Sequence, residues 1–534
     1  MTTTTEAAAK AGTGVWRFFA HEDDYPDLDE QACCERLGQA LAIPTVSHMD
    51  PSLTDWSKFE ALHAFMRSSF PHVFAAGEVT LVDQSLLIVL PGSDPALRPM
   101  MLMGHQDVVP VVAGTEADWT HDAFSGHVDD TFVWGRGAMD MKDQTIGELE
   151  AAEYALSHGW KLRRTLVLAF GQDEECLQSG SAALSAELAR RGIELEFLVD
   201  EGDYRVVDSA EYGAPGGWLM HADLAEKGYA DIELVTRSKG GHSSNPFGGT
   251  SLAVLAEAIA RIARERWDVR ITPLTEALLG ELAGRITEGP LAKLGLRDAE
   301  DVRARAGEIA EACLRDRQLF PLVTTTCAPD VIEGSSSACN VMPQDMRAVI
   351  NFRLLEGTTV ARVLERCREL VADLPVEVSL GGGSSNPTPA GLVGGPGLEL
   401  LRRVAGRYFQ VPADEGDARV GGGTPGLSSE AGDGTRAMGS EADDPRSGAP
   451  KSGAAVDAET GRAPVTVVPS TVIGATDARM YAPLCDECLR FSAFVVDDDE
   501  CARGVHGTNE RITRRAYMQG IRFLVRLIEE ACVR

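Results

Sequence analysis

The stretch TLVLAFGQDEE, residues 165–175, decides the expected fold because an unbroken apolar run passes directly into three acidic residues. Such a run is typical of a strand buried on both faces of a sheet. Two more apolar runs end in polar residues, RPMMLMGHQDVVPV (residues 98–111) and LEFLVDEGD (residues 195–203), and segments of helical spacing separate the three. This alternation predicts an α/β domain with a mostly parallel sheet, whose chemistry lies at the carboxyl ends of the strands.

The middle of the chain has a different pattern, which predicts an inserted α+β module. ADIELVTRS (residues 230–238) alternates apolar and polar side chains, as in a strand with one face in water. Helical segments and further strands follow as far as VEVSL, residues 376–380, after which the first pattern returns. We therefore expect an outer domain formed by residues 1–215 and 381–534, with residues 216–380 inserted into it.

A second interruption falls within the last part of the chain. Residues 413–464 are rich in Gly, Ala, Ser, Asp, Glu and Pro and contain almost no bulky apolar side chains. Such a composition buries too little surface to offset the entropy lost on ordering, so we expect a disordered surface insertion. Its GGG and GTP strings lack the GK[ST] of a phosphate-binding loop.

Charge and composition exclude several classes of protein. The chain of 534 residues has a formal net charge of -31, which disfavours nucleic acid as a partner. No apolar run reaches the ~18 residues of a membrane span, and the N-terminus lacks the basic and apolar regions of a secretory signal. The 11 cysteines, including the pair Cys485 and Cys488, are read as reduced thiols. These features predict a cytoplasmic protein without a membrane partner.

Candidate metal ligands stand where the apolar runs end. His105 in GHQDVVP is followed by Asp107, which is placed to fix the tautomer of a metal-bound imidazole. Asp140 lies in WGRGAMDMKD, and the DEE and VDEGD clusters end the other two runs. Any one acidic cluster could be a solvated loop, but several at the same edge of one sheet repel one another unless a cation neutralises them. Carboxylate and imidazole ligands without cysteine suit a pair of zinc ions.

The ordered set of motifs resembles the M20 metallopeptidase family, which includes aminoacylase, carboxypeptidase S and succinyl-diaminopimelate desuccinylase. The matching motifs, in chain order, are GHQDVVP, GRGAMDMKD, DEE, VDEG, KGGHSS, NVMP with NFR, ATDAR and VHGTNE. EKGYADIEL and VHGTNERI are most similar to the carboxypeptidase S and N-acyl-amino-acid hydrolase branch. The resemblance implies a two-domain, zinc-peptidase-type fold with an inserted dimerisation or lid domain, and a homodimer.

The resemblance also implies a role for each matching residue. The implied metal ligands are Asp140 as the bridge, His105 with Asp200 on one ion, and Glu175 with His506 on the other. The implied catalytic residues are Glu174 as general base, Asp107 behind His105, and His242 reaching the active site of the partner subunit. The implied residues for the substrate carboxylate are Asn340, Arg353 and Arg479. The sequence departs from the family pattern at Ala475 and Met480, which concerns specificity more than metal binding.

The predicted activity is zinc-dependent hydrolysis of a peptide or N-acyl amide bond next to a free carboxylate. Two metal ions can polarise the scissile carbonyl and acidify water, and an adjacent carboxylate can take the proton. The resemblance implies two Zn²⁺ per subunit, with Co²⁺ or Mn²⁺ as alternatives. A desuccinylase or deacetylase of another N-acylated metabolite is the alternative enzyme. A non-catalytic binding protein of the same fold is the alternative outside enzymes, but the residue at the base position, Glu174, is retained.

Overall fold

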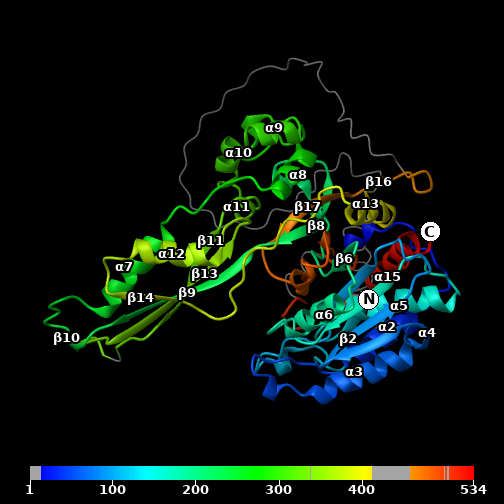
Figure 1. Cartoon of the computed structure of the whole chain (residues 1–534), viewed down its shortest axis with the longest axis horizontal. Coiled ribbons are helices and arrows are strands. Elements are labelled where there is room, and N and C mark those ends of the chain that lie inside the picture. Colours follow the sequence, from blue (N-terminus) through cyan, green and yellow to red (C-terminus); the bar gives the residue numbers. More distant parts are fainter. Residues whose placement is uncertain (1–13, 337, 412–456, 498–499, 502–503) are drawn as a thin grey trace, which may run out of the picture.

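The computed structural model describes residues 14–336, 338–411, 457–497, 500–501 and 504–534. Two separate sheets organise these residues, and Figure 1 shows the smaller sheet projecting from the larger body. The larger sheet has nine strands in the order β1, β2, β5, β3, β6, β18, β8, β17, with β7 beside β8. Their bounds are β1 (Glu78–Val82), β2 (Ser85–Leu90), β3 (Met100–His105), β5 (Leu166–Gly171), β6 (Phe197–Asp200), β7 (Val207–Asp208), β8 (Trp218–Glu226), β17 (Thr466–Val472) and β18 (Cys488–Arg490).

The centre of this sheet is parallel, which confirms the α/β fold predicted from the apolar runs. β5, β3, β6 and β18 all run in the same direction. Alternate residues of β3 enter different cores: Met100 and Leu102 lie on one side, and Met101 and Met103 lie on the other. Side chains in a strand alternate between faces, so a strand covered on both sides must be apolar throughout.

Helices cover both faces of the large sheet. The larger core is formed with α2 (Glu30–Leu41), α3 (Trp56–Ser69), α4 (Pro71–Ala76), α5 (Lys142–Ser157), α13 (Pro396–Tyr408) and α15 (Arg514–Ile528). The opposite core is formed with α6 (Ser179–Arg190). A short antiparallel pair, β4 (Phe132–Trp134) and β19 (Arg511–Thr513), brings the C-terminal part of the chain beside the segment that carries Asp140.

The small sheet is antiparallel and has helices on one face. Its strands follow the order β11 (Thr326–Glu333), β13 (Asp345–Leu354), β9 (Gly228–Arg237) and β14 (Val376–Leu380). Apolar residues of α7 (Ser251–Ala263) and α12 (Val360–Leu370) form a core with β9 and β13. A pair of two-residue strands, β10 (Gly241–His242) and β12 (Val341–Met342), lies at the outer end of this sheet (Figure 1).

The inserted segment does not form one compact module, contrary to our expectation. β8 belongs to the large sheet, so the chain passes into the small sheet at Lys227 rather than at residue 216. The helical residues after α7 form α8 (Pro273–Leu282), α9 (Ala299–Ala304), α10 (Ala306–Cys313) and α11 (Phe320–Val323). These helices share a core with Leu219 of β8 and Val468 of β17, because their apolar faces cover that side of the large sheet.

Part of the segment expected to be disordered is ordered. Most of residues 413–464 lies outside the described residues, but residues 457–464 form a turn and the strand β16 (Ala463–Pro464), which pairs with β15 (Gln410–Val411). The Asp457 carboxylate accepts hydrogen bonds from the backbone of Glu459 and Thr460 and from the Gln410 side chain. These contacts fix the turn despite its polar composition, because the side-chain hydrogen bonds replace the missing apolar contacts.

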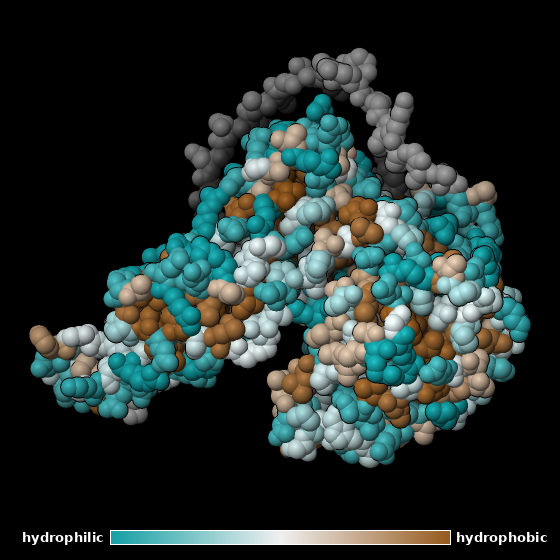
Figure 2. All heavy atoms as spheres, in the orientation of Figure 1, coloured by the Kyte–Doolittle hydropathy of each residue, from teal (hydrophilic) through white to brown (hydrophobic). Residues whose placement is uncertain are grey.

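The space-filling view shows a wide hollow between the outer part of the small sheet and the large-sheet body (Figure 2). Both sides of the hollow present mixed polar and apolar surface in this view. Among the described residues, no helix is both long enough and apolar enough to cross a membrane.

Candidate metal centre

Asp140 lies between the two histidines predicted to bind metal. Its Oδ1 is 3.1 Å from Nε2 of His105, and its Oδ2 is 3.1 Å from Nε2 of His506. His105 ends β3, whereas His506 belongs to the turn before β19 and has a positive φ of 57°. A positive φ is uncommon for a residue other than glycine and is often found at functional sites. One carboxylate thus faces one imidazole through each of its oxygens, as a bridging ligand would.

Glu510 holds the turn that carries Asp140, although sequence reasoning gave it no role. Its buried carboxylate accepts the backbone N–H groups of Met139 and Asp140 through Oε1, at 2.9 and 3.2 Å. Oε2 accepts Gly137 N at 3.0 Å and pairs with Arg136 at 2.6 Å. Glu510 ends the VHGTNE motif, so the same short segment supplies both His506 and the residue that shapes the opposite turn. The sequence signal that could have pointed to Glu510 is its position within this motif.

Three glutamates complete the cluster, and they follow the two strands that flank β3 in the sheet. Oε2 of Glu175 is 3.1 Å from Nε2 of His506, and Oε1 of Glu201 is 4.0 Å from Nε2 of His105. Ligand atoms of His105, Asp140 and Glu175 lie within 4.8 Å of one another, as do those of His105, Glu174 and Glu201. These acids follow β5 and β6, whose carboxyl ends lie at one edge of the parallel sheet.

Asp200 does not belong to this cluster, and its predicted role requires correction. Its Oδ2 accepts the backbone N–H of Ala478 at 2.8 Å, and its Oδ1 accepts that of Glu201 at 2.9 Å. Burial raises the pKa of Asp200 to about 6. Since successive residues of an extended chain point in opposite directions, only one of the two acids in VDEG can face His105. That residue is Glu201.

Asp107 lies behind His105, as predicted, and also fixes the acidic turn after β5. Its Oδ1 is 3.2 Å from Nδ1 of His105. The same carboxylate accepts the backbone N–H groups of Glu174 and Glu175, at 3.1 and 3.2 Å, and the hydroxyl of Ser47. One fully buried carboxylate therefore orients the imidazole and positions the two glutamates next to each other.

The electrostatics of the cluster indicate a missing positive charge. Burial raises the pKa of Glu201 well above its ordinary value, and the charge of Asp140 raises it further. Burial likewise raises the pKa of Glu174, with Asp477 and Glu175 adding to the shift against the opposing effect of His105. Oε1 of Glu175 is buried and has no hydrogen-bond partner among the described residues. Oxygen and imidazole donors, surplus negative charge and a free buried carboxylate oxygen all fit a site for divalent cations.

The residues predicted to contact substrate from the inserted segment belong to the small sheet and its outer end, not to the strands that carry the cluster. His242 is exposed on β10, at the outer end of the small sheet (Figure 1), and its Nδ1 is 2.8 Å from the Ser244 hydroxyl. Asn340 is also exposed and lies beside it, since its carbonyl accepts Ser243 N at 2.9 Å. Arg353 on β13 stacks over the Tyr229 ring at 4.8 Å.

Arg479 lies closer to the metal cluster, in the helical turn η7 (Asp477–Tyr481) that also contacts Asp200 through Ala478. Its Nη2 donates to the carbonyl of Asn386 at 3.1 Å, and its Nη1 is 3.9 Å from Glu226. Glu226 is held by Arg490, a fully buried arginine that the sequence did not single out, at 2.6 Å. Arg490 neutralises Glu226, which leaves the guanidinium of Arg479 weakly paired.

A family model for "Peptidase family M20/M25/M40" matches residues 101–530, which include every residue of the cluster described above. This chain belongs to that family. It is therefore a hydrolase, and its family is metal-dependent.

Individual relatives agree with this assignment. The chain is 27% identical to "Probable carboxypeptidase S-like 2" of Dictyostelium discoideum, over 95% of this chain and 87% of that protein. It is 29% identical to "N-fatty-acyl-amino acid synthase/hydrolase PM20D1" of Mus musculus, over 95% of this chain and 89% of that protein. Carboxypeptidase S of Saccharomyces cerevisiae is 33% identical, over 62% of this chain and 59% of that protein.

Solved structures share the fold at lower identity. An M20 family metallo-carboxypeptidase from Sulfolobus solfataricus superposes with a TM-score of 0.59 and 16% identity, over 93% of this chain and 99% of that one. Human carnosine dipeptidase 1 superposes with a TM-score of 0.56 and 15% identity, over 96% of this chain and 98% of that one. The two-domain fold predicted from the sequence is thereby confirmed.

Proposed function

We propose that this hydrolase uses two zinc ions to cleave a peptide or N-acyl amide bond next to a free carboxylate. The arrangement that carries the proposal is Asp140 between His105 and His506, with Glu174, Glu175 and Glu201 around them. The names of the relatives, carboxypeptidase S and N-fatty-acyl-amino acid hydrolase, support this substrate class. The eleven free cysteines are in keeping with a cytoplasmic setting.

The donor set divides naturally between two ions. Asp140 would bridge them, His105 and Glu201 would hold one, and Glu175 and His506 would hold the other. When bound, the ions supply Lewis-acid polarisation of the scissile carbonyl and make water easier to deprotonate. Carboxylate and imidazole ligands suit zinc, although Co²⁺ or Mn²⁺ can occupy the same donors.

Glu174 is placed to move the proton. It lies half-buried beside the proposed ligands, and its Oε1 accepts a hydrogen bond from Nε2 of Gln178 at 2.8 Å, which orients the carboxylate. A carboxylate in this position accepts a proton from the attacking water and then delivers it to the leaving amide nitrogen. Asp107 fixes the position of Glu174 relative to the proposed ligands, because its carboxylate accepts the backbone N–H of Glu174.

The substrate carboxylate requires a cation near the cluster. Arg479 is the arginine on the turn that contacts Asp200, and its guanidinium has further N–H donors for a charged partner beyond its carbonyl contact. His242, Asn340 and Arg353 lie on the small-sheet domain, so we propose that they act on a second copy of the chain in a homodimer.

The correction from Asp200 to Glu201 can be tested by metal content. Glu201→Gln is expected to bind less than two equivalents of metal, because an amide is a weaker ligand than a carboxylate. Asp200→Asn is expected to keep both ions and instead to lose about 1–3 kcal/mol of stability, the effect of disturbing a buried hydrogen-bonded group. Elemental analysis measures the metal content of each variant, and thermal denaturation measures its stability. Full metal in Glu201→Gln together with loss in Asp200→Asn would restore the original assignment.

The action of His242 on a second copy predicts complementation. His242→Ala and Glu174→Gln are each expected to be nearly inactive alone. A mixed dimer has one site with its own Glu174 and the partner copy's His242, so equal mixing should restore about a quarter of wild-type activity. Native mass spectrometry would establish that mixed dimers form. Mixed dimers without activity would show that His242 does not act across the dimer.

A hydrolysis screen tests the proposed function itself. Zinc-loaded protein is expected to release amino acids from dipeptides or from N-acyl amino acids, with either short or fatty acyl groups. Release of succinate or acetate only from substrates that lack the adjacent carboxylate would favour the desuccinylase or deacetylase alternative. No turnover of any substrate by fully metal-loaded protein would favour a binding protein.

A further inference from the structure

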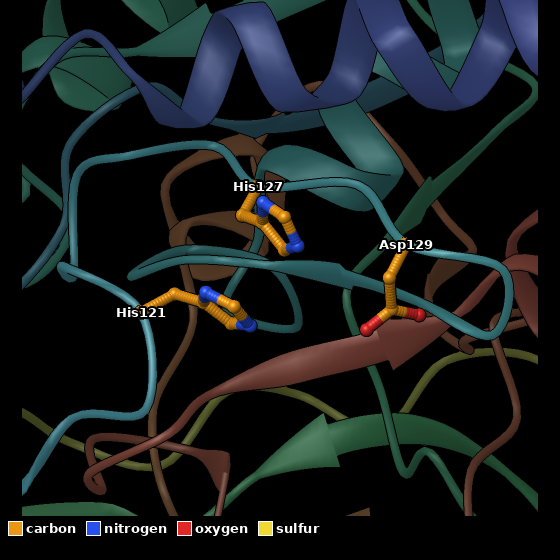
Figure 3. Close-up of side chains that lie close together, drawn as sticks. All are labelled: His121, His127 and Asp129. Carbon is orange, nitrogen blue, oxygen red and sulfur yellow. The ribbon is translucent and has the colours of Figure 1, made fainter.

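A second cluster of potential metal ligands lies outside the centre described above. It consists of His121, His127 and Asp129, on the loop that leads into β4. One nitrogen from each imidazole and one oxygen of the carboxylate lie within 4.8 Å of one another. The two rings stack with their centroids 3.8 Å apart and their planes at 21°, so sharing an ion in the plane of both rings requires one of them, such as the exposed His127, to rotate. Figure 3 shows that each ring directs a nitrogen to the side on which Asp129 lies.

Asp129 is held in place before any ligand binds. Its Oδ1 accepts the backbone N–H groups of Thr131 and Phe132 at 2.7 and 2.8 Å, and its Oδ2 accepts Nε1 of Trp134 at 2.7 Å. Partial burial opposes ionisation, but these hydrogen bonds lower the pKa of Asp129 overall. A carboxylate has about four lone-pair positions, so one remains free to coordinate a cation.

The surroundings are compatible with a bound cation. Arg511 lies over the Trp134 ring at 4.5 Å, but its guanidinium pairs with Glu500 at 2.7 Å, which offsets its charge. His127 is exposed and the other two residues are half-buried, so an ion can enter from solvent. The same loop contacts the catalytic centre indirectly, since Thr120 N donates to Oδ1 of Asn509 at 2.6 Å, in the turn that carries His506.

We propose that His121, His127 and Asp129 form a third metal site, separate from the two catalytic ions, for a divalent transition metal of the Zn²⁺ or Ni²⁺ class. Two imidazoles and a carboxylate suit such ions better than Mg²⁺ or Ca²⁺, which take mainly oxygen ligands. Three protein ligands leave the remaining positions to water. Through Thr120 and Asn509, a bound ion would also hold the loop against the turn of His506.

The site is tested by titrating Ni²⁺ into full-length protein whose catalytic centre already holds zinc. Wild type is expected to bind one further equivalent by equilibrium dialysis, with a change in tryptophan fluorescence because Trp134 contacts both Asp129 and His121. Trp134→Phe should retain binding but lose the fluorescence change. His121→Gln and His127→Gln should weaken binding by at least the ~10-fold that losing even an outer-shell partner produces.

His158→Gln is the matched control, since His158 is an exposed histidine paired with a single aspartate, Asp27, at 2.5 Å. It should bind Ni²⁺ as wild type does. Because the His127 side chain is exposed, His127→Gln should fold normally, which thermal denaturation without Ni²⁺ checks. The proposal is overturned if wild type binds no equivalent beyond the catalytic pair, or if His127→Gln binds Ni²⁺ as tightly as wild type.

Discussion

Replacing Glu174 with glutamine is expected to lower kcat by about 10²–10⁴-fold while both metal ions remain bound. Glutamine keeps the size of the side chain and can still contact Gln178, but it cannot accept a proton from water. The proposed ligands are other residues, and Asp107 would still hold the turn through the backbone N–H groups of Glu174 and Glu175. Steady-state kinetics and elemental analysis on the same sample measure both effects.

Asp173 provides a matched control within the same acidic triplet. Its carboxylate faces away from the cluster and accepts hydrogen bonds from the Ser179 hydroxyl and Gly180 N at the start of α6. Asp173→Asn should therefore reduce stability but leave kcat close to that of wild type. Wild-type turnover by Glu174→Gln would exclude Glu174 as the base.

Asp140→Ala is expected to remove most of the catalytic metal and nearly all activity. Asp140 contacts both histidines, so on the proposed assignment its loss would remove a ligand from each ion at once. The remaining carboxylates would then repel one another without a bridging cation. The exposed Asp130, which is not part of the cluster, supplies the control, since Asp130→Ala should retain the catalytic metal and activity. Two full equivalents of catalytic metal in Asp140→Ala would show that Asp140 is not the bridge.

The sequence predicted the position of the site because strand ends can be read from apolar runs. Runs such as residues 165–175 end where the chain leaves a doubly covered strand, and parallel strands bring those ends together at one edge. The same reasoning could not choose between Asp200 and Glu201. That choice depends on the residue at which β6 ends, and a shift of one residue reverses the direction of the side chain.

Other features depend on tertiary contacts that leave little local signal. The helices after α7 have apolar faces that would suit either domain, and their packing against β8 and β17 is decided only by the assembled sheet. Residues 457–464 have a disordered composition, yet Asp457 forms enough hydrogen bonds to fix a turn. Glu510 and Arg490 act through buried hydrogen bonds to residues far away in sequence, which composition and spacing do not reveal.

The central proposal is that the enzyme hydrolyses an amide next to a free carboxylate, and one comparison tests it most directly. The measurement is kcat/KM of the zinc-loaded enzyme for an N-acyl amino acid and for the same compound with its carboxylate converted to a carboxamide. A charged hydrogen bond contributes about 1.5–3 kcal/mol, so the carboxamide should react roughly 10- to 100-fold more slowly. Equal kcat/KM values for the two compounds would contradict the proposal.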